Sequence, residues 1–187
     1  MCREQLPVWQ QLHEQFSDKV QFVGITFDAQ GPEKPRFYVE KASITFPMLV
    51  DSQNVLGKHF GFKVLPNGLL VEPGGVIVYS KFGGFEIRET DRRIAIEKWI
   101  LSDQVPGAEN PISDPFQDEC LKLFQDGIVA LENHNKGLAA ELWRKAVKID
   151  PKNLVVRKQL WALENPDRFY EGDVDLDWQK GLFEKGL

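Results

Sequence analysis

Two cysteines, Cys2 and Cys120, are the side chains of this sequence best suited to nucleophilic or redox chemistry. Two cysteines cannot build a disulfide framework, and by themselves they cannot complete a zinc site. Cys120 lies in the apolar helical run ECLKLF, which predicts a buried structural thiol. Cys2 opens the run CREQLP at the start of a predicted helix. A lone thiol there could form mixed disulfides or be glutathionylated, but it cannot complete a dithiol cycle alone.

Carboxylates near the C-terminus resemble a calcium-binding loop in their spacing. Four acidic residues stand at positions 1, 3, 5 and 12 of an EF-hand-like pattern: Asp173, Asp175, Asp177 and Glu184. Trp178, however, occupies the position where that loop requires glycine, and no helix clearly follows. We therefore expect no metal and no other cofactor, and we interpret the segment as a tail that docks Leu176 and Trp178 on the body of the protein.

Charge and hydropathy exclude two classes of partner. The sequence has 23 Lys and Arg against 28 Asp and Glu, a net charge of −5 at pH 7, with no basic cluster. This argues against a nucleic-acid surface. The longest apolar runs, such as GLLV and VIV, fall far short of the roughly 20 residues of a membrane span. The sequence as given predicts no secretory signal before Cys2, but an upstream signal would change that prediction, so the compartment stays open.

Residues 1–101 predict alternating helices and strands, which is typical of an α/β layer. Leu, Trp, Leu and Phe recur at spacings of three and four within residues 6–16, which predicts an amphipathic helix. Residues 20–28, VQFVGITFD, alternate little and therefore predict a strand covered on both faces. The turn Pro-Gly-Gly predicts an antiparallel hairpin over residues 68–82. A short helix is expected between these elements, with Ser52 as its N-cap.

The rest of the chain predicts a small helical unit. Residues 102–115 are dense in Pro, Gly, Ser and Asp, which predicts a linker and a domain boundary. Residues 116–165 predict three helices, and residues 166–187 a C-terminal tail.

Small and large residues in the helical unit are spaced as in a tetratricopeptide repeat (TPR), which they resemble. Five residues carry the pattern: Gly127, Ala139, Trp143, Ala146 and Pro151. The small residues would let two antiparallel helices approach closely, and the proline would end the second helix. Asp126 and Ala130 depart from the pattern, which prefers Leu and Tyr there. We expect one TPR-like hairpin with a third, capping helix; the alternative is a generic helical hairpin that only packs on the first domain.

Residues 2–99 resemble thioredoxin-like redoxins of the TlpA/ResA type, which are related to the AhpC/TSA family. Their hallmark is WCxxC followed by R-x-E-x-P, and CREQLP matches its second half, with Cys2 as the second cysteine and Pro7 as the helix proline. Glu4 and Gln5 are close to, but not identical with, the usual acid. Further along, Leu65 and Pro66 match the cis-proline that faces the dithiol, although Asn67 replaces the usual Thr.

The resemblance implies a thioredoxin-like α/β fold that lacks its first strand, followed by the all-α unit. The nucleophilic cysteine of the family lies three residues before Cys2 and would precede Met1. A missing central strand would leave ladder groups unpaired on both flanking strands, at about 1 to 3 kcal/mol for each buried group. We therefore expect Met1 to be an internal methionine of a longer protein. The alternative is a short, non-catalytic scaffold.

The resemblance also implies roles for individual residues. Cys2 would resolve a mixed disulfide, and Pro66 would hold the backbone of Val64, Leu65, Pro66 and Asn67 against a substrate chain. Asp28 could assist proton transfer to the Cys2 thiol, although a solvated aspartate at a strand end is the simpler interpretation. The peroxidase motif Pro-x-x-x-Thr-x-x-Cys is not found.

Two functions follow as hypotheses. One is a thiol-disulfide oxidoreductase that acts on protein thiols and disulfides. The other is a thioredoxin-like and TPR-like interaction scaffold with a partner protein at the helical repeat.

Overall fold

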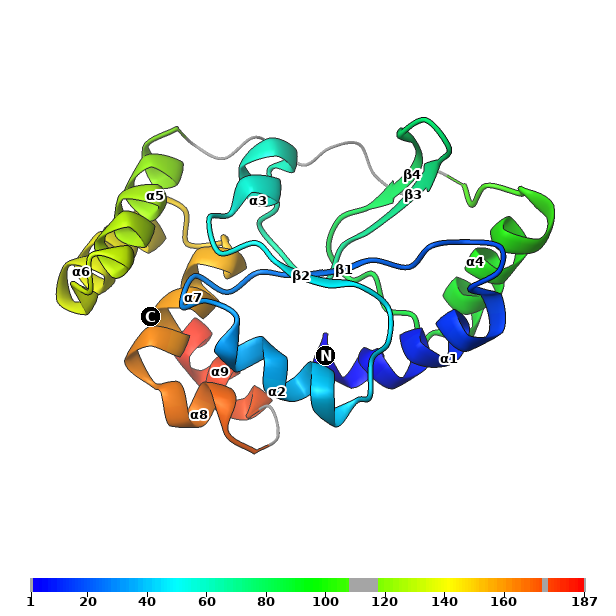
Figure 1. The fold of residues 1–187 in the computed structure, drawn as a ribbon. Coiled ribbons are helices and arrows are strands. Elements are labelled where there is room, and N and C mark those ends of the chain that lie inside the picture. Colours follow the sequence, from blue (N-terminus) through cyan, green and yellow to red (C-terminus); the bar gives the residue numbers. More distant parts are fainter. Residues whose placement is uncertain (1, 108–117, 173–174, 187) are drawn as a thin grey trace.

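The computed structural model describes residues 2–107, 118–172 and 175–186 (Figure 1). The elements up to residue 102 are η1, a short 3-10 helix (Arg3–Gln5), α1 (Leu6–Phe16), β1 (Gly24–Thr26), α2 (Glu33–Lys41), β2 (Met48–Val50), α3 (Val55–Phe60), β3 (Gly68–Glu72), β4 (Val76–Lys81) and α4 (Thr90–Ser102). The helical elements that follow are α5 (Asp118–Glu132), α6 (Lys136–Ile149), α7 (Leu154–Glu164), α8 (Pro166–Tyr170) and α9 (Leu176–Glu184). None of the helices in these described ranges combines the length and the apolar content that a bilayer span requires.

The strands of the described chain form two separate two-stranded sheets. β1 pairs with β2 in parallel, with Ile25 opposite Leu49. β3 and β4 form the predicted antiparallel hairpin, with an irregularity between Leu70 and Val71. No ladder joins β1 to β3 within the described residues, so β1 and β3 each have one edge without a strand partner there.

The predicted strand over residues 20–28 is shorter than expected. Of this segment Gly24–Thr26 are paired, because β2 is its one strand partner among the described residues and is itself three residues long. Val23 and Ile25 remain 51% and 47% exposed. The prediction that both faces of this strand are covered is therefore wrong.

Helix α3 begins later than predicted and uses a different cap. The carboxylate of Asp51 accepts hydrogen bonds from Val55 N at 2.7 Å and from Leu56 N at 2.9 Å. The N-cap position is Asn54, in a left-handed conformation. The prediction of Ser52 as N-cap is therefore wrong, because the helix starts two residues later than predicted and the Asp51 carboxylate accepts from its first two amides.

The apolar face of α1 packs against the hairpin and α4, as its spacing predicts. The buried members of this first core are Leu12, Phe16, Leu70, Tyr79, Phe85, Ile87 and Ile96. Trp9 lies at its margin, stacked on Phe85 with ring centroids 5.8 Å apart.

A second core lies among α5, α6 and α7. Trp143 is fully buried beside Phe124, and its indole Nε1 donates a hydrogen bond to the carbonyl oxygen of Phe124 at 3.1 Å. A Cβ atom at Gly127 would overlap that indole ring. Cys120 is fully buried in this core, which confirms the prediction of a structural thiol.

Helix α7 joins the helical region to the N-terminal part. Val155 N donates to Lys63 O at 3.1 Å, and Ala29 N donates to Gln159 Oε1 at 3.0 Å. Phe27, just after β1, also lies edge-on to Phe124 of the second core. Figure 1 shows α5 to α9 gathered at the end of the molecule away from α1 and α4.

The predicted linker begins where α4 ends, at Ser102, but its residues 108–115 lie outside the described residues. The predicted division into domains thus stays a prediction. In the tail, Trp178 lies near Trp161, with ring centroids 6.3 Å apart, whereas Leu176 is 48% exposed. Docking is confirmed for Trp178 and wrong for Leu176.

The acidic residues of the EF-hand-like pattern that the structure describes have other roles. Asp173 lies outside the described residues, and Asp175 caps α9 by accepting a hydrogen bond from Trp178 N at 2.9 Å. Because α9 begins inside the pattern, its later acidic residues are helical rather than part of an open loop.

Candidate functional site

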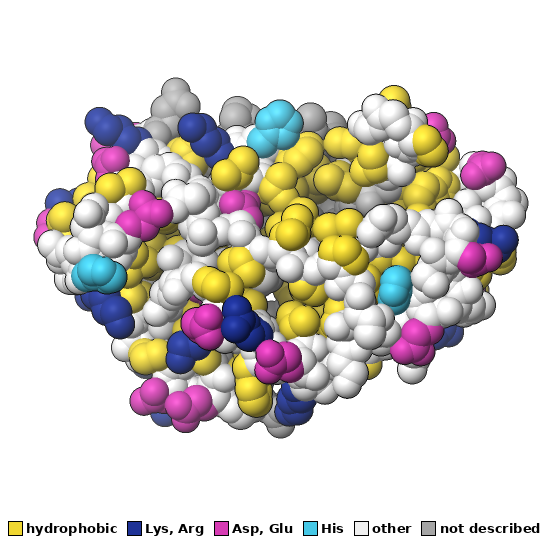
Figure 2. Space-filling view, viewed as in Figure 1, with side chains coloured by type: hydrophobic (Ala, Val, Ile, Leu, Met, Phe, Trp, Pro, Cys, Tyr) yellow, Lys and Arg dark blue, Asp and Glu magenta, His cyan; other side chains and the backbone are white. Residues whose placement is uncertain are grey.

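A cavity of about 720 Å³ lies between the two sheets. Its walls include β1 with its flanking residues 23–28 and the segment 64–71 that enters β3. Hydrophobic side chains gather over the middle of the face seen in Figure 2, where the strands lie. All residues predicted to act in thiol chemistry line this cavity: Cys2, Asp28, Val64, Leu65, Pro66 and Asn67.

The thiol of Cys2 is free and keeps contact with solvent at the start of η1. The protein atoms packed around the sulfur displace water and raise the pKa of Cys2, because desolvation penalises the thiolate. The ammonium of Lys158, from α7, opposes this and lowers the pKa. For Cys120, burial raises the pKa to about 11, so that thiol is protonated at neutral pH.

Asp28 is buried at the end of β1, with 5% of its surface exposed. Its carboxylate accepts a hydrogen bond from Gln30 N at 2.9 Å and another from the Tyr170 hydroxyl at 2.8 Å. Desolvation raises the pKa of Asp28, and these hydrogen bonds only partly oppose the effect. The interpretation of Asp28 as a solvated strand end is therefore wrong.

The loop over residues 64–67 contains a cis peptide bond between Leu65 and Pro66. Phe85 N donates to Pro66 O at 3.1 Å, and Gly83 N donates to Asn67 Oδ1 at 2.6 Å. The loop is thus tied to the segment after β4, while Val64 stays exposed at the cavity.

The sequence did not predict three residues at this cavity as site residues: Gln5, Lys158 and Tyr170. Gln5 lies buried three residues after Cys2, and its Oε1 accepts a hydrogen bond from Ile87 N at 2.9 Å. Lys158 and Tyr170 come from the helical region, more than a hundred residues away in sequence. Only the position of Gln5 next to the expected acid gave a signal, since nothing local to α7 or α8 points to Cys2.

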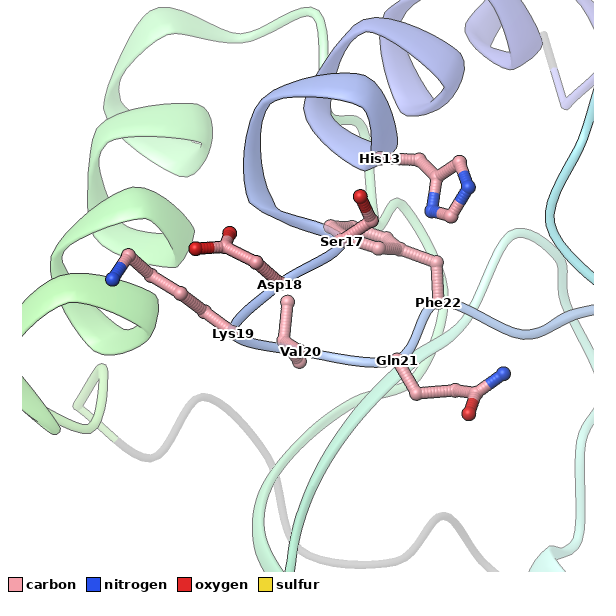
Figure 3. Close-up of a pocket in the computed structure, with 7 residues that line it drawn as sticks. All are labelled: His13, Ser17, Asp18, Lys19, Val20, Gln21 and Phe22. Atoms are coloured by element: carbon pink, nitrogen blue, oxygen red, sulfur yellow. The ribbon is translucent and has the colours of Figure 1, made fainter.

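A second, smaller hollow of about 330 Å³ lies at the end of α1 (Figure 3). The His13 imidazole lies edge-on to Phe22 and Phe46, with ring centroids 5.8 Å and 5.5 Å apart. Asp18 and Lys19 point away from that imidazole (Figure 3). No group of three or more His, Cys, Asp or Glu in the described ranges is arranged to hold a metal ion.

Comparisons with known proteins bear on the N-terminal part of the chain. Residues 1–80 match the AhpC/TSA family. The Thioredoxin-like protein YneN of Bacillus subtilis (strain 168) is 24% identical over 98 residues, which are 51% of this chain and 57% of that relative. The chain therefore spans little more than half the length of this relative, and no solved structure matches it significantly. These matches support a redoxin-type, thioredoxin-like domain in the N-terminal part. In the structure a largely helical region follows it.

Proposed function

We propose that this protein is a thiol-disulfide oxidoreductase of the redoxin type, in which Cys2 is the resolving cysteine. One observation carries the proposal: Cys2, Asp28 and the cis-proline loop line the same cavity although they are far apart in sequence. The match to the AhpC/TSA family supports the same class of protein. Protein disulfides are the proposed substrates, and the loop 64–67 is the proposed contact for their backbone.

The proposed step is a thiol-disulfide exchange. A substrate sulfur is first joined to the nucleophilic cysteine in a mixed disulfide. The Cys2 thiolate attacks the sulfur of that cysteine, and a disulfide forms between the two cysteines. The substrate sulfur leaves with the electron pair of the broken bond and takes up a proton, so the substrate is reduced and the cysteine pair is oxidised. Asp28, whose pKa is raised, accepts the proton that Cys2 gives up.

The proposal puts the nucleophilic cysteine on an upstream strand, as in redoxins of the TlpA/ResA type. Support comes from the cavity between β1 and β3, which has a strand edge on each side and apolar walls. An extended segment there would pair with both edges and would cover Val23 and Ile25, which are now half exposed. Its last residues would run toward Cys2.

An interaction scaffold is the second candidate. The observation in its favour is the close packing of α5 on α6 at Gly127 and Trp143, which is the contact expected of a TPR-like hairpin. Against it, α7 is already engaged with Lys63 and Ala29 of the first part. A partner protein would therefore bind the outer surface of α5 and α6.

The exchange chemistry can be tested with oxidised glutathione. We expect the chain of residues 1–187 to gain one glutathione, located by mass spectrometry in the Lys-C fragment that holds Cys2 and ends at Lys19. A C2S variant should gain none, because Cys120 is fully buried. A Cys2 that stays unmodified in the folded protein would overturn the proposal.

The upstream cysteine is tested by the intact mass of the endogenous protein, before and after alkylation of reduced thiols. We expect a mass several kilodaltons above 21.4 kDa and three labelled cysteines. A mass of 21.4 kDa with two labels would exclude a dithiol enzyme and leave the scaffold as the function.

A further inference from the structure

Helix α7 turns one face toward the cavity that holds Cys2. Leu154, Val155, Lys158 and Gln159 line the cavity, and their spacing of three and four residues sets them on one side of the helix. Two hydrogen bonds hold this face of α7 against the N-terminal part: Val155 N donates to Lys63 O, and Ala29 N donates to Gln159 Oε1. The position of Lys158 between them is therefore set by the fold.

Lys158 brings an ammonium to the cavity that the Cys2 thiol also lines. Both side chains line it, and their electrostatic interaction acts on both groups. Burial lowers the pKa of Lys158, and Cys2 is the group that opposes this. Within the described part of the chain no carboxylate pairs with the Lys158 ammonium. Its charge is thus available to the sulfur.

Other charged groups around this end of the cavity are already engaged. They are Arg3, Glu4, Asp28, Lys34, Glu86 and Arg88. The Lys34 ammonium lies over the Tyr170 ring, 5.1 Å from its centroid. Glu86 raises the pKa of Cys2, but it is bound by Arg88 at 2.7 Å, and Arg88 also pairs with Glu4 at 3.1 Å. Asp28 is held by Tyr170 and Gln30. The guanidinium of Arg3 lies over the Tyr38 ring, 4.3 Å from its centroid.

A second observation points to the same place. Gln5 is 2% exposed, and its Nε2 finds no acceptor among the described residues. Gln5 lines the cavity with Cys2 and Lys158. A buried amide donor without an acceptor costs about 1 to 3 kcal/mol, so this donor is suited to an electron-rich atom that enters the cavity, such as a sulfur or a peptide carbonyl.

We infer that Lys158 is a positioning residue for the thiol chemistry of Cys2, since its ammonium favours the thiolate and makes α7 part of the thiol site. The inference rests on the proposed function only in taking Cys2 as the exchanging thiol. It deepens that function by assigning the helical region a direct part in controlling the reactivity of Cys2.

The test is the pH profile of Cys2 alkylation by iodoacetamide. Lys158→Met keeps the length and apolar stem of the side chain but removes its charge. We expect K158M to react about threefold to tenfold more slowly than the wild type near neutral pH, and its profile to lie at higher pH. Lys158→Arg should restore the wild-type profile. Lys152→Met is the matched control, because Lys152 is exposed on the turn between α6 and α7 and does not line the cavity.

Two results would overturn the inference: a K158M profile that coincides with that of the wild type, or a loss of equal size in K152M. Lys158→Gln repeats the measurement if K158M does not fold. Glutathione exchange at Cys2 is measured in the same wild-type protein. Its absence would contradict the proposed function, while the alkylation profile would still decide the role of Lys158.

Discussion

Asp28 and Tyr170 are 142 residues apart in sequence, yet they share a buried hydrogen bond. The Tyr170 hydroxyl also accepts a hydrogen bond from Gln30 Nε2 at 2.9 Å, and the Tyr38 hydroxyl donates to the Tyr170 carbonyl. This small network connects the end of β1, α2 and α8. Desolvation raises the pKa of Tyr170 as well as that of Asp28, so both groups hold their protons more tightly than in water.

Replacing Asp28 with Asn should change how stability depends on pH. Above the ordinary Asp pKa of 3.8, the folded state retains a proton that the unfolded state releases, so the stability contributed by Asp28 falls as pH rises toward its raised pKa. Asn does not titrate. We expect the thermal unfolding midpoint of D28N, relative to that of the wild type, to increase as pH rises from acid to neutral.

The control for this change is Asp18→Asn, which removes a carboxylate from an exposed site. A difference between D28N and the wild type that is constant across pH would contradict the raised pKa.

At the scale of elements, the sequence predicts those features that depend on local pattern. The amphipathic spacing of α1 and the Pro-Gly-Gly turn between β3 and β4 are sufficient signals, and both elements form. β1 differs, because the length and burial of a strand depend on neighbouring strands and helices that its own residues do not encode.

The residues at the cavity also divide into those that local sequence predicts and those that only packing brings there. Cys2 and Pro66 are found by motif, whereas Lys158 and Tyr170 reach the cavity only through the packing of α7 and α8.

Gly127 of α5 lies directly against the Trp143 indole of α6. Gly127→Ala would drive a methyl group into the Trp143 indole, which is fully buried and cannot move aside. We expect a loss of about 1 to 3 kcal/mol in the free energy of unfolding, measured with urea.

Gly181→Ala is the matched control for this substitution. Gly181 lies within α9, and a Cβ atom there meets nothing within 4 Å. Alanine at that position should be neutral or stabilising by about 0.5 to 1 kcal/mol. Equal effects at the two glycines would contradict the close packing of α5 on α6.

At the scale of the whole molecule, two apolar cores of the described residues are joined through the surroundings of the cavity that Cys2 lines. Lys63 pairs with Asp150 at 3.1 Å, and both side chains are largely buried. Phe27, Ala29 and Leu65 pack against the second core while their neighbours line the cavity. We therefore expect substitutions in the helical region to affect the residues that line the cavity.

Gln159→Ala tests this junction. The change removes the acceptor of the Ala29 amide at a buried position, so we expect a loss of about 1 to 3 kcal/mol and faster hydrogen exchange at Ala29. The exposed Gln53, which bonds Glu132 on α5, provides the control, and Q53A should cost under about 0.5 kcal/mol. An unchanged exchange rate at Ala29 in Q159A would show that the two cores are not coupled through this bond.

The separation of the two sheets has a consequence for the behaviour of the protein in concentrated solution. β1 consists of Gly24, Ile25 and Thr26, with no charge or proline to discourage a neighbour, and its side away from β2 has no strand partner among the described residues. Such an edge is a template for cross-chain pairing. We therefore expect aggregation to begin at β1. A strand that pairs with this edge would also prevent its pairing with another molecule.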